Sequence, residues 1–171
     1  LISKNTELPI MAYNIPGRTS TLIEIETLEK LVDDIGIHSI KDAVGDLEFS
    51  RLELEALKDK VDIYSGNDSE TIEFMKMGGK GVVSVASHVV GKEIYQLIES
   101  VSADEIEAAE QIQNILLPIF DMLFEEPSPG PVKYLLTKTW EDVGTPLMPI
   151  TDITPDLSNK ILDYYKKIKK D

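Results

Sequence analysis

The chain is 171 residues long, enough for about one domain. Its 31 acidic and 17 basic side chains give a net charge of −14, and because such a surface repels phosphate, neither nucleic acid nor an anionic membrane is an expected partner. No apolar run approaches the roughly 18 residues of a membrane-spanning helix, and the lack of cysteine excludes disulfides and thiolate chemistry while fitting a reducing cytoplasm.

Four short apolar segments in the first 90 residues are typical of strands that are buried on both faces. They are rich in Val and Ile, and segments with helical spacing of apolar residues separate them at the intervals of βαβ units. The expected strands are residues 9–14, 37–43, 61–66 and 81–86. We therefore predict a parallel α/β sheet in residues 1–90.

Beyond residue 90 the apolar spacing is helical throughout, which predicts a helical domain over residues 91–171. Several residues mark expected helix ends. Gly36 is an expected stop, and Asp68 or Ser69 is an expected N-cap. Ser102 with Glu105 predicts a capping box, and Thr154 with Pro155 predicts the start of the last helix.

Four βα units are half of a (β/α)₈ barrel, which needs eight strands and about 250 residues. Four strands cannot close a small barrel, since two edges and an apolar inner face would stay uncovered. We therefore expect either an open sheet or a barrel whose other half lies outside this chain. Leu1 in place of an initiator Met favours the second alternative.

Lys41 is the most informative residue, because it lies in an apolar segment that is expected to be buried. Burial penalises the charged form of an amine, and a neutral amine attacks carbonyl groups to form a Schiff base. The alternative from spacing alone is an exposed lysine at the strand end, paired with Asp42 or Asp46.

The segment 13–19 ends the first expected strand, and Pro16 followed by Gly17 predicts a turn there. Tyr13 would lie at the strand end, where a phenol can relay a proton. Arg18 would lie in the loop, where its guanidinium suits a carboxylate substrate. The alternative is an ordinary turn with a surface arginine.

Gly66 follows the third expected strand, where the lack of a side chain lets a substrate approach the backbone closely. The glycines of segment 78–81 lack the spacing of a phosphate-binding loop, so they are interpreted as a helix stop. The two histidines, His38 and His88, are too few for a metal site and are interpreted as structural residues, so no metal site is expected.

Together, segments 13–19, 36–47, 65–68, 78–85 and 129–133 resemble the 4-hydroxy-tetrahydrodipicolinate synthase family, also called dihydrodipicolinate synthase. The resemblance covers essentially the whole chain. It corresponds to the C-terminal part of the family pattern, from the fifth barrel strand onward. It therefore implies strands 5–8 of a TIM (β/α)₈ barrel in residues 1–90, and the last barrel helix with a C-terminal helical domain in residues 91–171.

The resemblance also implies a class I aldolase, in which Lys41 forms a Schiff base with pyruvate and the enamine attacks L-aspartate 4-semialdehyde. Tyr13 would relay protons, Arg18 would hold the semialdehyde carboxylate, and Gly66 and the backbone near Val83 would line the pyruvate pocket. No cofactor is implied, and the family context is a cytoplasmic homotetramer in lysine and diaminopimelate biosynthesis. Because part of the proton relay precedes this segment in the family, we expect the chain alone to be inactive.

Three alternatives stay open at this stage. A sister enzyme with the same lysine chemistry, N-acetylneuraminate lyase or a 2-keto-3-deoxy sugar-acid aldolase, would carry residues other than Arg18 in that loop. A truncated, inactive half-barrel fragment fits Leu1 and the missing strands. A generic α/β binding module explains the strands, but it does not explain Lys41 in a buried segment with Tyr13 and Arg18 before it.

Overall fold

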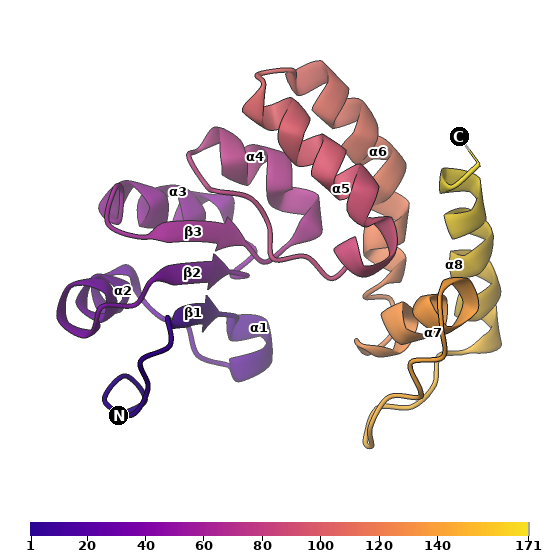
Figure 1. Cartoon of the computed structure of the whole chain (residues 1–171), viewed down its shortest axis with the longest axis horizontal. Coiled ribbons are helices and arrows are strands. Elements are labelled where there is room, and N and C mark those ends of the chain that lie inside the picture. Colours follow the sequence, from indigo (N-terminus) through magenta and orange to yellow (C-terminus); the bar gives the residue numbers. More distant parts are fainter. Residues whose placement is uncertain (171) are drawn as a thin grey trace. The chain divides into compact units, whose positions relative to one another are not determined.

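A computed structural model describes residues 1–170 of the chain, which divides into two units, Leu1–Val83 and Ser84–Asp171. The first unit holds a three-stranded sheet with helices, and the second is built from helices (Figure 1). Among residues 1–170, no helix is long and apolar enough to cross a membrane. Each unit is described by itself below.

The sheet of the first unit is parallel, in the order β1–β2–β3. Its strands are β1 (Met11–Asn14), β2 (Ser39–Asp42) and β3 (Asp62–Ser65) (Figure 1). The register pairs Tyr13 with Lys41 and Lys41 with Tyr64. Because side chains alternate between the two faces of a strand, these three residues form a row on one face of the sheet.

Short helices follow each strand of the first unit. They are α1 (Pro16–Thr19), α2 (Ile25–Lys30) with a π-helical continuation (Leu31–Ile35), α3 (Leu47–Ala56), a 3₁₀ turn (Asp68–Glu70) and α4 (Thr71–Lys76). The expected stop at Gly36 is confirmed, since Gly36 adopts a left-handed conformation with φ of 74° directly after the π-helical turn. Asp46 caps α3 by accepting hydrogen bonds from the backbone N–H groups of Glu48 and Phe49.

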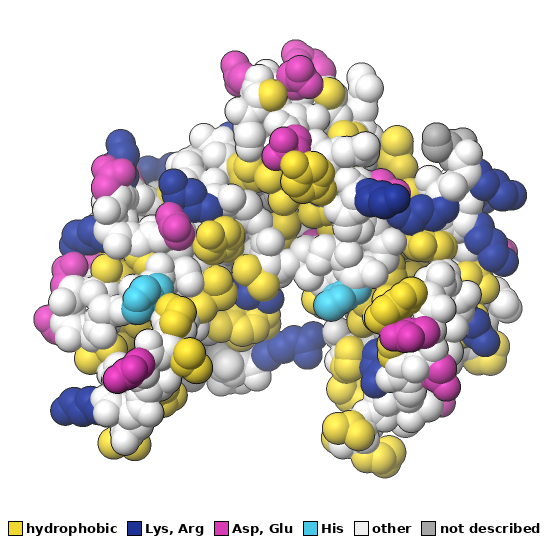
Figure 2. All heavy atoms as spheres, viewed as in Figure 1, with side chains coloured by type: hydrophobic (Ala, Val, Ile, Leu, Met, Phe, Trp, Pro, Cys, Tyr) yellow, Lys and Arg dark blue, Asp and Glu magenta, His cyan; other side chains and the backbone are white. Residues whose placement is uncertain are grey.

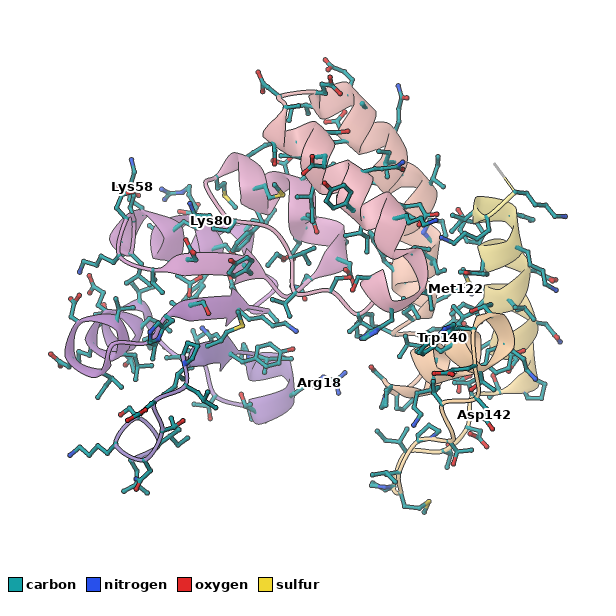
Figure 3. The ribbon with its side chains drawn as sticks, viewed as in Figure 1. Arg18, Lys58, Lys80, Met122, Trp140 and Asp142 are labelled. Atoms are coloured by element: carbon teal, nitrogen blue, oxygen red, sulfur yellow. The ribbon has the colours of Figure 1, made fainter. Side chains whose placement is uncertain are left out.

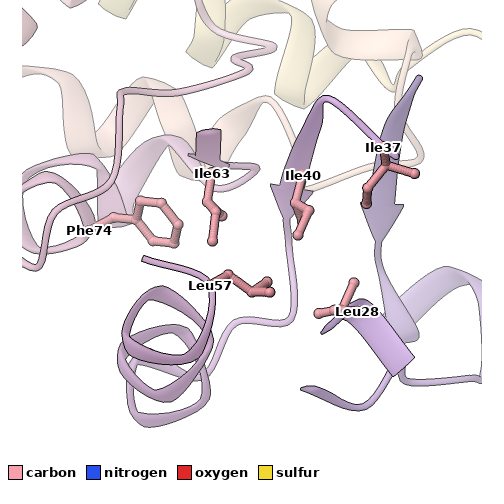
Figure 4. Close-up of a cluster of buried hydrophobic side chains, with 6 residues drawn as sticks. All are labelled: Leu28, Ile37, Ile40, Leu57, Ile63 and Phe74. Carbon is pink, nitrogen blue, oxygen red and sulfur yellow. The ribbon is translucent and has the colours of Figure 1, made fainter. Parts of the chain in front are cut away.

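The core of the first unit lies between the sheet and these helices (Figure 4). Its buried side chains come from both layers and from the segments that join them: Leu28, Ile37, Ile40, Leu57, Ile63 and Phe74. Full burial of each large apolar side chain contributes about 1.5–3 kcal/mol. The core therefore occupies the face of the sheet opposite the row of Tyr13, Lys41 and Tyr64.

The prediction of a fourth strand over residues 81–86 is wrong. This segment makes a single parallel bridge, between Val82 and Ser65, before α5 begins at Ser87. The backbone N–H of Val83 donates to the carbonyl oxygen of Ser65 at 2.8 Å, so the segment still lies against the end of β3. Within residues 1–170, no further strand pairs with it, and a ladder that stops after one bridge does not hold a segment extended.

Over residues 84–170, the second unit contains four longer helices: α5 (Ser87–Ser102), α6 (Ile106–Met122), α7 (Gly130–Thr139) and α8 (Pro155–Ile168) (Figure 1). The predicted start of α8 is confirmed, because Thr154 Oγ1 accepts a hydrogen bond from the Leu157 N–H with Pro155 in the first turn.

Two predicted caps are wrong. Ser102 belongs to the end of α5, where its hydroxyl donates to the Ile98 carbonyl oxygen, so it is not free to cap α6. Asp68 and Ser69 lie inside the 3₁₀ turn that precedes α4, and the residue at the N-cap position of α4 is Glu70.

Replacing Ile40 by Ala is expected to lower the free energy of unfolding by about 2–5 kcal/mol, because Ile40 is fully buried between the sheet and the helices. The matched control is Leu52→Ala, which removes an exposed leucine of α3 and is expected to change stability by less than about 0.5 kcal/mol. Urea unfolding of both variants measures the difference, and equal midpoints would contradict the assigned core.

Candidate active site

The candidate site lies at the carboxyl ends of β1, β2 and β3, on the face of the sheet opposite the core. Lys41 of β2 is half-buried, and its Nζ lies 4.2 Å from the centroid of the Tyr13 ring. Tyr13 precedes the last residue of β1, and the parallel register brings it beside Lys41. Two residues distant in the sequence thus lie side by side.

The alternative of a surface lysine paired with Asp42 or Asp46 does not describe this structure. The carboxylate of Asp42 accepts hydrogen bonds from the Val44 N–H and the Ser50 hydroxyl, and Asp46 caps α3. None of the ion pairs found among residues 1–170 includes Lys41. The amine is therefore directed to the Tyr13 ring rather than to a carboxylate.

Gly66 packs against the side chain of Lys41. A Cβ built on Gly66 would lie 2.9 Å from Lys41 Cε, 2.9 Å from the Asp42 carbonyl oxygen and 2.6 Å from Ala43 Cβ. Its backbone N–H donates to that same Asp42 oxygen at 2.5 Å. The position therefore has no room for a side chain, which gives the predicted glycine a steric reason.

Val83 joins this group through its backbone. Its N–H donates to the Ser65 carbonyl oxygen, one residue before Gly66. The backbone of Val83 thus lies at the same strand end as Lys41 and Gly66. Tyr13, Lys41, Gly66 and Val83 form what we call the lysine site.

Arg18 is the predicted site residue that directly follows β1 in the chain. It is exposed on the short helix α1, and its side chain extends away from that helix (Figure 3). The loop that carries it is held by Asn14, a buried side chain at the end of β1. The Asn14 amide donates to the Ile23 carbonyl oxygen and accepts from the Ile23 N–H, both at 3.0 Å.

A buried carboxyl pair lies behind the lysine site and was not found from the sequence. Asp42 Oδ2 accepts from the Ser50 hydroxyl at 2.5 Å, and Glu53 lies one helical turn after Ser50 with its side chain fully buried. Burial, together with the charge of Asp42, raises the pKa of Glu53 to about 8. The helical spacing of Ser50 and Glu53 was the only signal, and it equally describes an ordinary amphipathic helix.

The described residues 1–170 contain no cluster of His, Cys, Asp or Glu that could hold a metal ion. An amine over a tyrosine ring, at the open end of a parallel sheet, can attack a carbonyl carbon, and the phenol can exchange protons with the product.

Residues 1–168 match the model of the dihydrodipicolinate synthetase family. The chain belongs to this family. It is 38% identical over 160 residues to the 4-hydroxy-tetrahydrodipicolinate synthase of Listeria monocytogenes serotype 4b, covering 94% of this chain and 55% of that protein. It is 39% identical over 156 residues to the synthase of Bacillus subtilis strain 168, covering 91% of this chain and 54% of that protein.

Solved structures of the family have the same fold. The dihydrodipicolinate synthase of Bacillus anthracis superposes with a TM-score of 0.91 at 36% identity, over 96% of this chain and 56% of that one. The enzyme of Aquifex aeolicus superposes with a TM-score of 0.93 at 30% identity, over 98% and 58% respectively. The chain thus spans about half the length of the family members that it matches.

Replacing Gly66 by Ala is expected to displace the Lys41 side chain and to lower the free energy of unfolding by about 1–3 kcal/mol, because the new methyl group would overlap with three neighbours. Gly17→Ala is the control, since a Cβ at Gly17 meets nothing within 4 Å. Thermal unfolding of both variants provides the measurement. A Gly66→Ala protein as stable as the Gly17→Ala protein would argue against this packing.

The stability of the chain is expected to fall as the pH rises from 4.5 to about 8, because folded Glu53 keeps a proton that the unfolded chain releases near 4.5. The stabilisation by protonated Glu53 is complete below the pKa that Glu53 has in the unfolded chain. At pH 7 the free energy of unfolding is lower by roughly 3 kcal/mol. Glu53→Gln should flatten this part of the profile, whereas Glu55→Gln, an exposed change in the same helix, should not. Urea unfolding between pH 4.5 and 9 tests this, and identical slopes in the two variants would refute it.

Proposed function

We propose that the chain carries the Schiff-base lysine of a 4-hydroxy-tetrahydrodipicolinate synthase, which condenses pyruvate with L-aspartate 4-semialdehyde in lysine and diaminopimelate biosynthesis. Family membership and the names of the relatives support this proposal. The observation that carries it is the position of Lys41, whose amine faces the Tyr13 ring at 4.2 Å while Gly66 leaves its stem room.

In the proposed reaction, the Lys41 amine attacks the keto carbon of pyruvate, and water leaves to give an imine. Loss of a proton from the pyruvate methyl group gives an enamine, which attacks the aldehyde carbon of the semialdehyde. Tyr13 is the proposed proton relay, Arg18 binds the semialdehyde carboxylate, and Gly66 with the Val83 backbone lines the pyruvate pocket. The lysine supplies the electron sink, so the proposal needs no cofactor.

We further propose that residues 1–90 form the second half of the family's (β/α)₈ barrel, strands 5–8, and that residues 91–171 form its last helix and a C-terminal helical domain. The parallel order β1–β2–β3 and the bridge at Val82 support the first part, and the helices of the second unit support the second. Three strands and one bridge cannot close a barrel, so we expect turnover only when further strands complete it.

A homotetramer and the cytoplasm are the proposed assembly and compartment. The helical unit has large apolar side chains at its surface, including Tyr95, Ile115 and Phe124, that an assembly could cover. Hydrophobic side chains are visible at the molecular surface in the space-filling view (Figure 2).

Incubating the chain with pyruvate and borohydride is expected to leave a reduced pyruvate adduct on Lys41, because borohydride fixes an imine as a stable amine. Mass spectrometry of peptides locates the adduct. Lys41→Arg should abolish the adduct and Lys58→Arg, a change at an exposed lysine, should retain it. An adduct on other lysines only, or none at all, would overturn the proposed function.

Arg18→Ala is expected to raise the KM for L-aspartate 4-semialdehyde about 10–100-fold with little change in the KM for pyruvate, because only the semialdehyde carboxylate would lose its charged partner. The assay uses the chain joined to the part of a family member that it does not cover, with pyruvate and a panel of aldehydes. Faster turnover with N-acetylmannosamine or a sugar aldehyde than with the semialdehyde would instead favour a lyase or sugar-acid aldolase.

A further inference from the structure

Asp42 connects the lysine site to the core side of the sheet. It follows Lys41 in β2, and because side chains alternate along a strand, its carboxylate lies on the face opposite the amine. Only 2% of Asp42 is exposed. A group that holds Asp42 therefore holds the backbone from which Lys41 projects.

Three hydrogen bonds fix Asp42. Its Oδ1 accepts from the Val44 N–H at 2.8 Å, and its Oδ2 accepts from the Ser50 hydroxyl at 2.5 Å. Its backbone carbonyl oxygen accepts from the Gly66 N–H at 2.5 Å. The last bond matters for Lys41, because Gly66 is the residue that packs against Lys41 Cε.

Glu53 of α3 completes this arrangement from the core side. Its side chain is fully buried, and neither carboxyl oxygen has a donor among residues 1–170. The polar group that acts on it is the Asp42 carboxylate, which is itself an acceptor. Two acceptors can be satisfied only if one of them carries a proton, and the raised pKa of Glu53, about 8, assigns the proton to Glu53 at neutral pH.

The other elements packed against α3 do not offer Glu53 a counter-ion. Asp42 is the only charged side chain among residues 1–170 that shifts the pKa of Glu53. The Glu53 carboxyl oxygens have no hydrogen bond to the other charged side chains of these neighbouring elements among residues 1–170: Glu26, Glu29 and Lys30 of α2, Glu73 and Lys76 of α4, and Asp62 of β3. Protonation of Glu53 therefore relieves the repulsion between the carboxyl groups of Glu53 and Asp42.

We propose that Glu53 is a positioning residue for the lysine site: as a neutral carboxylic acid it donates a hydrogen bond to Asp42 and so fixes the strand end that presents the Lys41 amine. This inference rests on the proposed Schiff-base function of Lys41. It adds to that function a residue that touches neither substrate nor amine and acts through Asp42 and Gly66.

Ionisation of Glu53 would change this arrangement. A second negative charge next to Asp42 in a site closed to water repels the first, which pushes α3 away from the end of β2. The strand end that presents the Lys41 amine is then no longer fixed. Imine formation therefore slows, and the site loses reactivity as Glu53 loses its proton.

The test compares the rate of pyruvate adduct formation, trapped by borohydride on Lys41 in the 171-residue chain, from pH 6 to 9.5. Glu53→Gln keeps an N–H donor for Asp42 and never ionises. Its rate should equal that of the parent chain at pH 6.5 and exceed it about tenfold at pH 9, one unit above the pKa of Glu53. The control Glu55→Gln, at an exposed position of α3, should follow the parent chain at every pH.

Superimposable profiles of the parent chain and Glu53→Gln would overturn the positioning role while leaving the proposed function intact. A lack of adduct in every protein at every pH would overturn both. If Glu53→Gln does not fold, infrared titration of the parent chain decides instead. A protonated carboxylic acid band that persists at pH 7 and disappears around pH 8 supports the role, and a chain with no such band at pH 7 excludes it.

Discussion

The register of three short parallel strands controls the chemistry available to this chain. Pairing of Tyr13, Lys41 and Tyr64 across β1, β2 and β3 places three side chains in a row on one face. The alternate residues Asn14, Asp42 and Ser65 then lie on the other face, where each is buried and hydrogen-bonded. A slip of one residue would exchange the two rows, so that the amine would face the apolar core and the carboxylate would take its place.

Much of the first unit followed from local sequence patterns. Runs of Val and Ile with helical segments between them predicted the parallel strands, and Gly36 predicted a helix boundary correctly. In the second unit, Thr154 likewise predicted the start of α8. The fourth strand failed because residues 81–86 have the composition of a strand but only one bridge to β3. Composition indicates which conformations suit a segment, whereas a strand also needs neighbouring strands to which its backbone can hydrogen-bond.

The candidate site could also be predicted only in part from the sequence. Tyr13, Lys41 and Gly66 could be proposed from the sequence because each lies at a strand end, and parallel strand ends meet at one edge of a sheet. Their contact distances came only from the structure. Glu53 could not be proposed, since a glutamate in an amphipathic helix ordinarily faces water. Only the direction of α3 against β2 shows that it does not.

The second unit shows how local signals compete. Ser102 and Glu105 have the spacing of a capping box, yet the Ser102 hydroxyl donates backward to Ile98 and completes the preceding helix instead. Both uses satisfy a polar group at a helix end, and the sequence alone does not rank them.

The proton retained by Glu53 also changes the energetics of folding itself. A formal charge of −14 treats every acidic side chain as ionised, but a buried Glu53 with a pKa of about 8 takes up a proton when the chain folds at neutral pH. Unfolding therefore releases that proton to the surrounding buffer. The calorimetric enthalpy of unfolding consequently includes the buffer's own heat of protonation, and it differs between phosphate and Tris solutions of the same pH.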